Sequence, residues 1–403
     1  MAQAFKNWRT PTLIILAGCL ISLLNFGVRA GFGLWLDPMS RTFEWSREVF
    51  ALAVAIQNLM WGVAQPFAGA LADRYGTARV LAAGAVIYAV GVFLVAFSGT
   101  PTTLTLSLGL LVGLGVAGSS FAIVLAAFGR MVPADRRSRA LGLGTAAGSM
   151  GQFLLVPAGQ LFLEAYGWQA ALIILSLFPL AIVPLATALA GRAEAAPGER
   201  HQSLGAAVRE AGGHRGYWLL VAGFFVCGFH VAFIQTHLPS YITDLGLAPE
   251  LGAWALASVG LFNVVGAYTS GVLGGRYSQK YLLSGLYVSR AVVIALFVLS
   301  PASVASVLAF SVAIGLLWLS TVPLTYGVVA KIFGPRYMAT LFGFVFFSHQ
   351  VGASLGVWLG GYLFAATGSY VTVWWMTVAL ALFAALVHLP IDDRQVVRPA
   401  EAG

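Results

Sequence analysis

Long apolar stretches, separated by short segments with Gly, Pro or charged residues, run along the whole chain. A helix needs about 20 residues to cross a bilayer, and each stretch is roughly that long. Helices are expected because backbone groups in hydrocarbon must find their hydrogen-bond partners within the segment. We predict an all-α integral membrane protein with twelve spans, at residues 12–36, 48–72, 79–98, 103–128, 140–163, 168–191, 217–242, 252–274, 282–299, 302–331, 338–365 and 370–389.

One block of the sequence occurs twice at an offset of 202 residues, as GALADRYGTARVL at 69–81 and GVLGGRYSQKYLL at 271–283. Because the offset is about half of the 403 residues, the repeat indicates a duplicated unit. We predict a six-helix half at 1–190 and a second at 217–403, which ends in a short cytoplasmic tail. The hydrophilic residues 191–216 are interpreted as a cytoplasmic linker, with a short amphipathic helix at 203–211 as an option.

Composition and charge agree with a membrane protein and predict its orientation. Hydrophobic residues make up 59% of the chain and charged residues only 9%, which excludes an ordinary soluble domain. On the assumption of alternating loops, 18 of the 22 Lys and Arg residues fall on the side of the N-terminus and two on the other side. The positive-inside rule then places both termini in the cytoplasm, in a bacterial inner membrane. The net charge of +8 follows from this bias, so no nucleic-acid partner is expected.

The first copy of the repeated block carries a specific set of glycines and charges: Gly69, Leu71, Asp73, Arg74, Gly76 and Arg79. This set resembles the cytoplasmic loop signature of the major facilitator superfamily, a family of membrane transporters. The resemblance implies that the glycines permit a tight turn while the charged residues hold the cytoplasmic side shut, with Arg276 as the counterpart of Arg74. Asp73, Gly76 and Arg79 become Gly275, Ser278 and Tyr281 in the second copy. The charged gate is therefore expected in the first half.

Residues 136–168 and 31–48 resemble monocarboxylate-porter-like members of that superfamily. One departure concerns the eighth span, where classical monocarboxylate porters carry an acid and an arginine; Asn263 and Ala267 stand there instead. A drug–proton antiporter is disfavoured because residues 106–118 of the fourth span lack the arginine typical of that group.

Two arginines, Arg29 and Arg290, fall inside predicted spans, whereas no predicted span has a carboxylate near its middle. Positive charge without buried acids favours an anionic substrate. Arg29 is the leading substrate anchor because it shares a helix face with Asn25 and Gly33; snorkelling to the outer interface is the alternative. Asn25 is a further candidate for substrate binding. Arg290 either binds substrate or hydrogen-bonds between helices.

His230 and His349 are expected near the membrane midplane, where a histidine can carry a proton at physiological pH. They are candidates for both proton coupling and substrate binding, with His349 preferred, and the alternative is a hydrogen-bonded core histidine. Gln152, Asn263 and Tyr326 are further candidates for substrate binding, or else bond between helices.

An enzyme is not expected, because the chain has no nucleotide-binding GxxxxGK[ST] loop, no zinc-ligand cluster and no nucleophile with a recognisable base. No cofactor or metal is predicted. A receptor that has the same fold but does not transport is a second class of function. Flux measurements would distinguish it from a transporter. The leading hypothesis is a monomeric secondary transporter of a small organic anion, a monocarboxylate, coupled to protons or to a counter-substrate. The alternative is an exporter of a larger amphipathic or drug-like compound.

Overall fold

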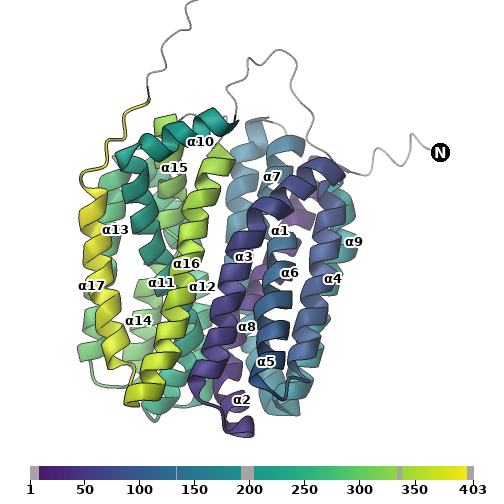
Figure 1. Cartoon of the computed structure of the whole chain (residues 1–403), viewed down its shortest axis with the longest axis vertical. Coiled ribbons are helices and arrows are strands. Elements are labelled where there is room, and N and C mark those ends of the chain that lie inside the picture. Colours follow the sequence, from purple (N-terminus) through teal and green to yellow (C-terminus); the bar gives the residue numbers. More distant parts are fainter. Residues whose placement is uncertain (1–8, 133, 192–203, 334–337, 397–403) are drawn as a thin grey trace, which may run out of the picture.

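The computed structural model describes residues 9–132, 134–191, 204–333 and 338–396, and every regular element in these ranges is helical (Figure 1). The first half contains α1 (Pro11–Ala30), η2 (Phe32–Trp35), α2 (Leu36–Phe43), α3 (Arg47–Tyr75), α4 (Thr77–Val95), α5 (Pro101–Leu104), η3 (Thr105–Leu111), α6 (Val112–Gly118), α7 (Phe121–Met131), α8 (Ala134–Ser176), η4 (Pro179–Ala181), α9 (Ile182–Ala186) and η5 (Thr187–Leu189). Helix α10 (Leu204–Gly213) follows. The second half contains α11 (Arg215–Asp244), α12 (Pro249–Gly274), α13 (Gln279–Leu299), α14 (Val304–Leu317), α15 (Thr321–Phe333), α16 (Met338–Thr367) and α17 (Val371–His388).

Eleven of the described helical stretches are long and apolar enough to cross a membrane, and one of them covers most of two predicted spans. That stretch, Ala146–Leu189, has 44 residues and a non-helical Gly167 with φ 79°. Gly167 permits this left-handed backbone conformation because it has no side chain. Two hydrogen bonds show that the chain reverses direction at this glycine. The next residue, Trp168, accepts a hydrogen bond from Trp35 at one end of the molecule. Ala190, further along the chain, accepts one from Arg9 at the other end. The predicted division between 163 and 168 is confirmed.

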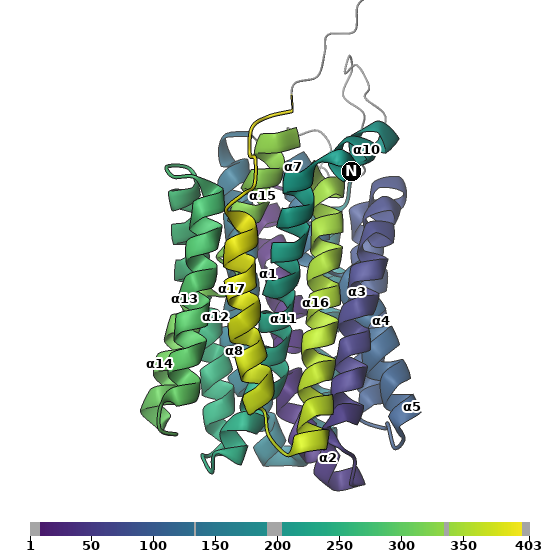
Figure 2. The ribbon, with the colours of Figure 1, turned by 60° about the vertical axis from the view of Figure 1, so that its left-hand side comes forward.

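The two ends of the helix bundle carry different elements. One end carries α10 and the segment after α17 (Figures 1 and 2), and we call it the linker end. There Lys331 pairs with Asp393 at 2.6 Å, and this contact lowers the pKa of the Asp393 carboxyl. The loop before α3 lies at the opposite end, which we call the far end. α10 occupies nearly the residues proposed for the optional linker helix, and it buries Ala207 and Ala211.

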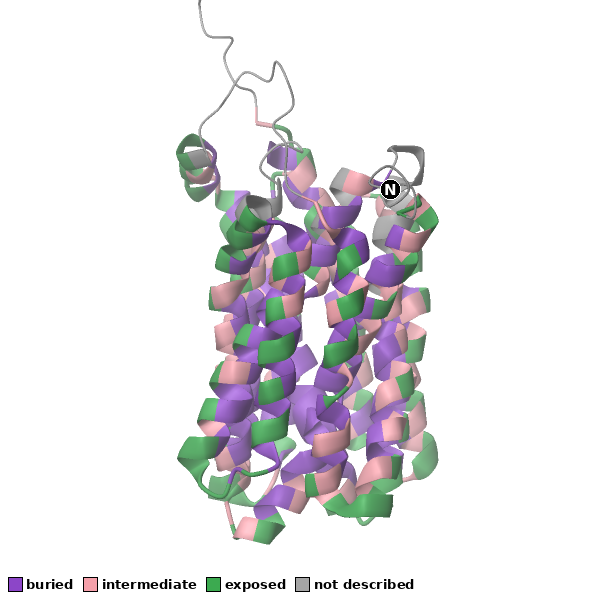
Figure 3. Cartoon of the chain, turned by 90° about the vertical axis from the view of Figure 1, so that its right-hand side faces the viewer, coloured by how far each residue is buried: buried purple, intermediate pink, exposed green. Residues whose placement is uncertain are grey.

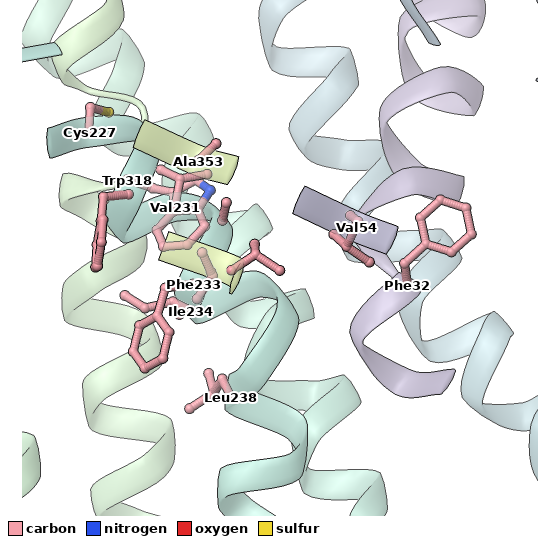
Figure 4. Packing of buried hydrophobic residues seen from close by; sticks show 14 of the residues in the cluster. Phe32, Val54, Cys227, Val231, Phe233, Ile234, Leu238, Trp318 and Ala353 are labelled. Atoms are coloured by element: carbon pink, nitrogen blue, oxygen red, sulfur yellow. The ribbon is translucent and has the colours of Figure 1, made fainter. Parts of the chain in front are cut away.

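Buried residues follow the inward faces of the helices, while exposed residues lie on the outer faces and at the two ends (Figure 3). One hydrophobic cluster includes residues of both halves, such as Val54 and Ala353. A close view shows its second-half members Phe233, Ile234 and Trp318, with Phe32 and Val54 across from them (Figure 4). A separate cluster lies in the first half toward the linker end and includes residues of α1, α4 and α7. The first half therefore has its own packing at that end.

Candidate functional site

Three pairs of segments form most of the contact between the halves: α3 with α16, α8 with α12, and the η2–α2 region with α11. The α3–α16 pair is close because glycines face it from both sides. A Cβ atom on Gly62 would lie 2.7 Å from Cβ of Gln350, and one on Gly361 would lie 2.4 Å from Cβ of Ala51. Side chains at these positions would push the helices apart. This packing runs from the far end to about the middle of the membrane-spanning region.

Arg29 lies at this interface and is 7% exposed. Its Nη2 donates to Oδ1 of Asn58 at 2.5 Å, and its Nη1 donates to Oε1 of Gln235 at 3.2 Å. Its guanidinium also lies 4.7 Å from the centre of the Trp61 ring, on α3. α1 and α3 belong to the first half and α11 to the second, so Arg29 joins the halves. Of the residues the structure describes, no carboxylate pairs with it.

A chain of polar contacts leads from Arg29 to His349. Asn58, the partner of Arg29, accepts a hydrogen bond at its backbone oxygen from Nε2 of Gln350, at 3.4 Å. Oε1 of Gln350 lies 3.0 Å from Nδ1 of His349. The His349 ring stacks on Phe346, with 5.6 Å between ring centres. The structure thus brings the two leading candidates, Arg29 and His349, into one network.

His230 and Asn25 point elsewhere. Nε2 of His230 lies 2.9 Å from the backbone oxygen of Thr377 on α17, within the second half. Asn25 donates to Oγ of Ser119 at 2.7 Å, within the first half. The shared helix face with Arg29 therefore does not bring Asn25 into contact with the guanidinium's partners.

Gln152 and Asn263 donate hydrogen bonds across the contact between α8 and α12. Gln152 donates to the backbone oxygen of Leu256 at 2.6 Å, and Asn263 donates to Oγ of Ser149 at 2.8 Å. Asn263 also accepts a hydrogen bond from the backbone N–H of Leu319. Tyr326 is 37% exposed and packs edge-on against Phe342. These residues lie between helices, and Gln152 and Asn263 bridge the halves directly.

The predicted gating residues lie at the linker end, but only some of their side chains are described. Gly76 has φ 97° between α3 and α4, a backbone conformation that favours glycine and accounts for the tight turn. A Cβ atom on Gly69 would meet nothing within 4 Å. Arg79 and Arg276 are exposed. The side chains of Asp73 and Arg74 lie outside the described residues, so the charged gate stays a prediction.

An ionic contact at the far end joins the halves, and sequence reasoning missed it. Arg47 donates to both oxygens of Asp244, at 2.5 and 2.8 Å, and pairs with Asp37 at 2.9 Å. Its guanidinium also lies 4.1 Å from the centre of the Phe364 ring. We call Asp37, Arg47 and Asp244 the far-end clamp. The sequence carries no spacing signal for it, because Arg47 and Asp244 are 197 positions apart.

The tenth span is interrupted between α14 and α15, and Arg290 contacts this break. Arg290 is 1% exposed. Its Nη2 donates to the backbone oxygen of Leu317 at 2.7 Å and also to that of Trp318. The last carbonyls of a helix lack intrahelical partners, and a cation there is favourable. These bonds lie within the second half, and they give Arg290 the inter-helix hydrogen-bonding role that the sequence left open.

A group of three His, Cys, Asp or Glu side chains placed to hold a metal does not occur in the described ranges.

This architecture defines a class of membrane transporter folds built from two six-helix halves. The sequence model described as Major Facilitator Superfamily matches residues 18–357 and 242–403, and the chain belongs to that superfamily. It is 25% identical over 386 residues to the MFS-type transporter YcxA of Bacillus subtilis, covering 91% of this chain and 92% of that one. It is 28% identical over 379 residues to monocarboxylate transporter 13 of Rattus norvegicus, covering 89% and 83%.

Solved structures support the same fold. A bacterial homologue of the human lysosomal transporter Spinster, in an inward-facing conformation, superposes with a TM-score of 0.77 at 16% identity, covering 94% of this chain and 96% of that one. The xylose transporter XylE from E. coli, in an inward-open conformation, gives a TM-score of 0.74 at 13% identity, covering 95% and 96%. Because the sequence model of the superfamily matches most of the chain, the chain is a transporter of this superfamily and not an enzyme.

We expect Arg290→Gln to lower the free energy of unfolding by about 2–4 kcal/mol, because it removes charge-assisted bonds to buried carbonyls at the break. Thermal or denaturant unfolding in detergent measures this. Arg276→Gln, at an exposed arginine of the same half, is the matched control and should change stability by less than about 0.5 kcal/mol. Equal stability of the two variants would contradict the role assigned to Arg290.

Proposed function

We propose that this transporter moves a small organic anion, specifically a monocarboxylate, across the bacterial inner membrane by alternating access, in exchange or together with protons. The observation that carries the proposal is the buried Arg29, which has amide oxygens and an aromatic ring as partners in place of a carboxylate. A buried guanidinium is costly without an opposite charge. An anionic substrate supplies that charge while it is bound. The similarity to monocarboxylate transporter 13 of Rattus norvegicus agrees with this substrate class.

His349 is the proposed proton-coupling residue, because its contact with Gln350 connects it to the partners of Arg29. His230 is the secondary candidate, since its ring contacts α17 rather than the interface. A proton on His349 adds positive charge to the network that holds the anion. Proton binding and anion binding then favour each other.

Alternating access is proposed to occur between halves 1–190 and 217–403, joined by the linker 191–216. Contact at the far-end clamp together with separate first-half packing near the linker end supports a conformation open toward the linker end. With both termini in the cytoplasm, as the charge bias indicates, this conformation is inward-facing. The far-end clamp is then the outer gate, and a single chain forms the complete site.

An apolar cavity supports the alternative, an exporter of an amphipathic compound. The cavity has a volume of about 430 Å³ and lies between α10, α11 and α16, with walls that include Tyr217, Trp218 and Phe344. It is large enough for the apolar part of a small molecule. Flux of amphipathic compounds without flux of short carboxylates would favour this function over the leading one.

We expect Arg29→Ala to lower the apparent affinity for a transported monocarboxylate by about 100-fold, because the substrate loses charge-assisted bonds. Uptake of labelled acetate, lactate, pyruvate and benzoate into proteoliposomes measures it. The control Arg41→Gln removes an exposed arginine at the far end and should leave the affinity unchanged. Unaltered affinity in Arg29→Ala would show that the anion binds elsewhere.

His349→Ala should abolish uptake driven by a pH gradient while carboxylate exchange at equal pH continues, because only the first process needs a moving proton. Both are measured in the same proteoliposomes. The control is His388→Ala, since His388 is also buried but bonds to Ala384 in its own helix. Full gradient-driven uptake by His349→Ala would rule out the proton role.

Asp244→Asn should open the far end, because a neutral amide holds Arg47 less strongly than a carboxylate does. Spin labels on Ser46→Cys and Ala248→Cys, with Cys19 and Cys227 replaced by serine, would report the distance across this end by pulsed electron paramagnetic resonance. We expect a larger population at long distance. The control Glu250→Gln alters an exposed carboxylate at the same end and should leave the distribution unchanged; a similar shift in both variants would refute the clamp as a gate.

A further inference from the structure

Arg29 and Gln235 each carry a buried N–H group that has no acceptor among the residues that the structure describes. These groups are Nε of Arg29 and Nε2 of Gln235. The two side chains are 7% and 5% exposed, and they already touch through Nη1 and Oε1 at 3.2 Å. A buried donor without an acceptor costs free energy. Two of them in one contact indicate that an acceptor belongs there.

The missing acceptor must suit one permanent positive charge and one amide. A carboxylate has two oxygens that accept hydrogen bonds, and it bonds to a guanidinium more strongly than a neutral amide oxygen does. It can therefore replace Oε1 of Gln235 as the partner of Arg29. The Gln235 amide can then turn so that its N–H₂ group, rather than its oxygen, faces the ligand.

The surrounding chain positions the two hydrogen-bond partners of Arg29, which are Asn58 and Gln235. Asn58 donates to the backbone oxygen of Val54 at 3.0 Å, so its own Oδ1 stays directed at Arg29. On the other side, the backbone of Gln235 approaches Gly33 so closely that a Cβ atom there would lie 2.5 Å from its carbonyl oxygen. Gly33 thus permits Gln235, from the second half, to reach the arginine of the first.

We propose that Gln235 is the second-half ligand of the substrate carboxylate and that its amide oxygen occupies Arg29 when substrate is absent. This inference rests on the proposed transport of an organic anion and adds the residue that completes its site. The single guanidinium selects a monoanion. Because one ligand comes from each half, a bound carboxylate bridges α1 and α11, and its binding energy depends on how the halves are placed.

The test uses the full-length protein in proteoliposomes with labelled acetate, lactate, pyruvate and benzoate, and the best-transported of these serves as the probe. Gln235→Leu should weaken the apparent affinity for the probe by about tenfold or more, because an N–H bond to a charged group is lost. Gln160→Leu is the control: Gln160 is also buried, with 7% of its surface exposed, but it donates to Glu164 near the far end. The apparent affinity of the Gln160→Leu variant for the probe should match that of the unmodified protein.

A second variant separates ligand binding from a structural role. Gln235→Glu places a fixed carboxylate against Arg29, so it should raise the thermal unfolding midpoint without ligand and abolish the stabilisation that the probe gives to the unmodified protein. If Gln235→Leu does not fold, Gln235→Asn, which shortens the amide by one methylene, should show the same loss of affinity.

The outcomes distinguish the two proposals. Absence of flux for all four carboxylates in the unmodified protein would overturn the proposed function and this inference with it. Normal flux together with unchanged affinity in Gln235→Leu would overturn the role of Gln235 alone. Probe-dependent stabilisation retained in Gln235→Glu would do the same.

Discussion

A guanidinium buried between two helix bundles, with amide oxygens as its hydrogen-bond partners, is the constraint on which this molecule depends. Removing an ion from water costs several kcal/mol even after relaxation, and hydrogen bonds to neutral groups offset only part of that. Arg29 obtains those bonds from both halves, through Asn58 and Gln235. The interface must therefore stay close enough to supply them, and the glycines of α3 and α16 make that approach possible. Burial of the Arg29 charge and close packing of the helices therefore both depend on the halves staying in contact at this interface.

In the proposed mechanism, one set of charged residues closes the far end and a separate buried charge binds the substrate. Carboxylates pair with Arg47 at the far end, where all three side chains retain some exposure, between 12% and 32%. An ion pair near water costs little to break and to form again, since water solvates the separated charges. In the middle of the membrane the same pairing would neutralise the charge of Arg29 permanently. No uncompensated positive charge would then remain to bind an anionic substrate. The absence of a carboxylate beside Arg29 among the described residues is what keeps that positive charge available.

Sequence patterns sufficed for the spans, because helix-length apolar segments have few alternatives in a bilayer. They also indicated Arg29 and His349, since ionisable side chains in apolar segments are unusual. The direction of each side chain could not be predicted from the sequence, because it depends on how each helix is rotated against its neighbours. That rotation sends His230 toward Thr377 and His349 toward Gln350. Gln235 was missed for a related reason: a neutral amide in an apolar segment gives no signal until its partner is known.

The duplication also has an asymmetry within the membrane. The offset of 202 residues carries Ser119, where α6 gives way to α7, onto Thr321, where α15 begins after the break in the tenth span. The two halves therefore keep an interrupted helix at equivalent positions. A neutral contact between Asn25 and Ser119 supports the first break, whereas the buried charge of Arg290 supports the second through the carbonyls of Leu317 and Trp318. Those carbonyls lie at the negative end of α14, so they hold Arg290 as a structural cation. Among the described residues, Arg29 bonds to side-chain amide oxygens and to no helix end, and in the proposed mechanism its charge is the one that binds the ligand.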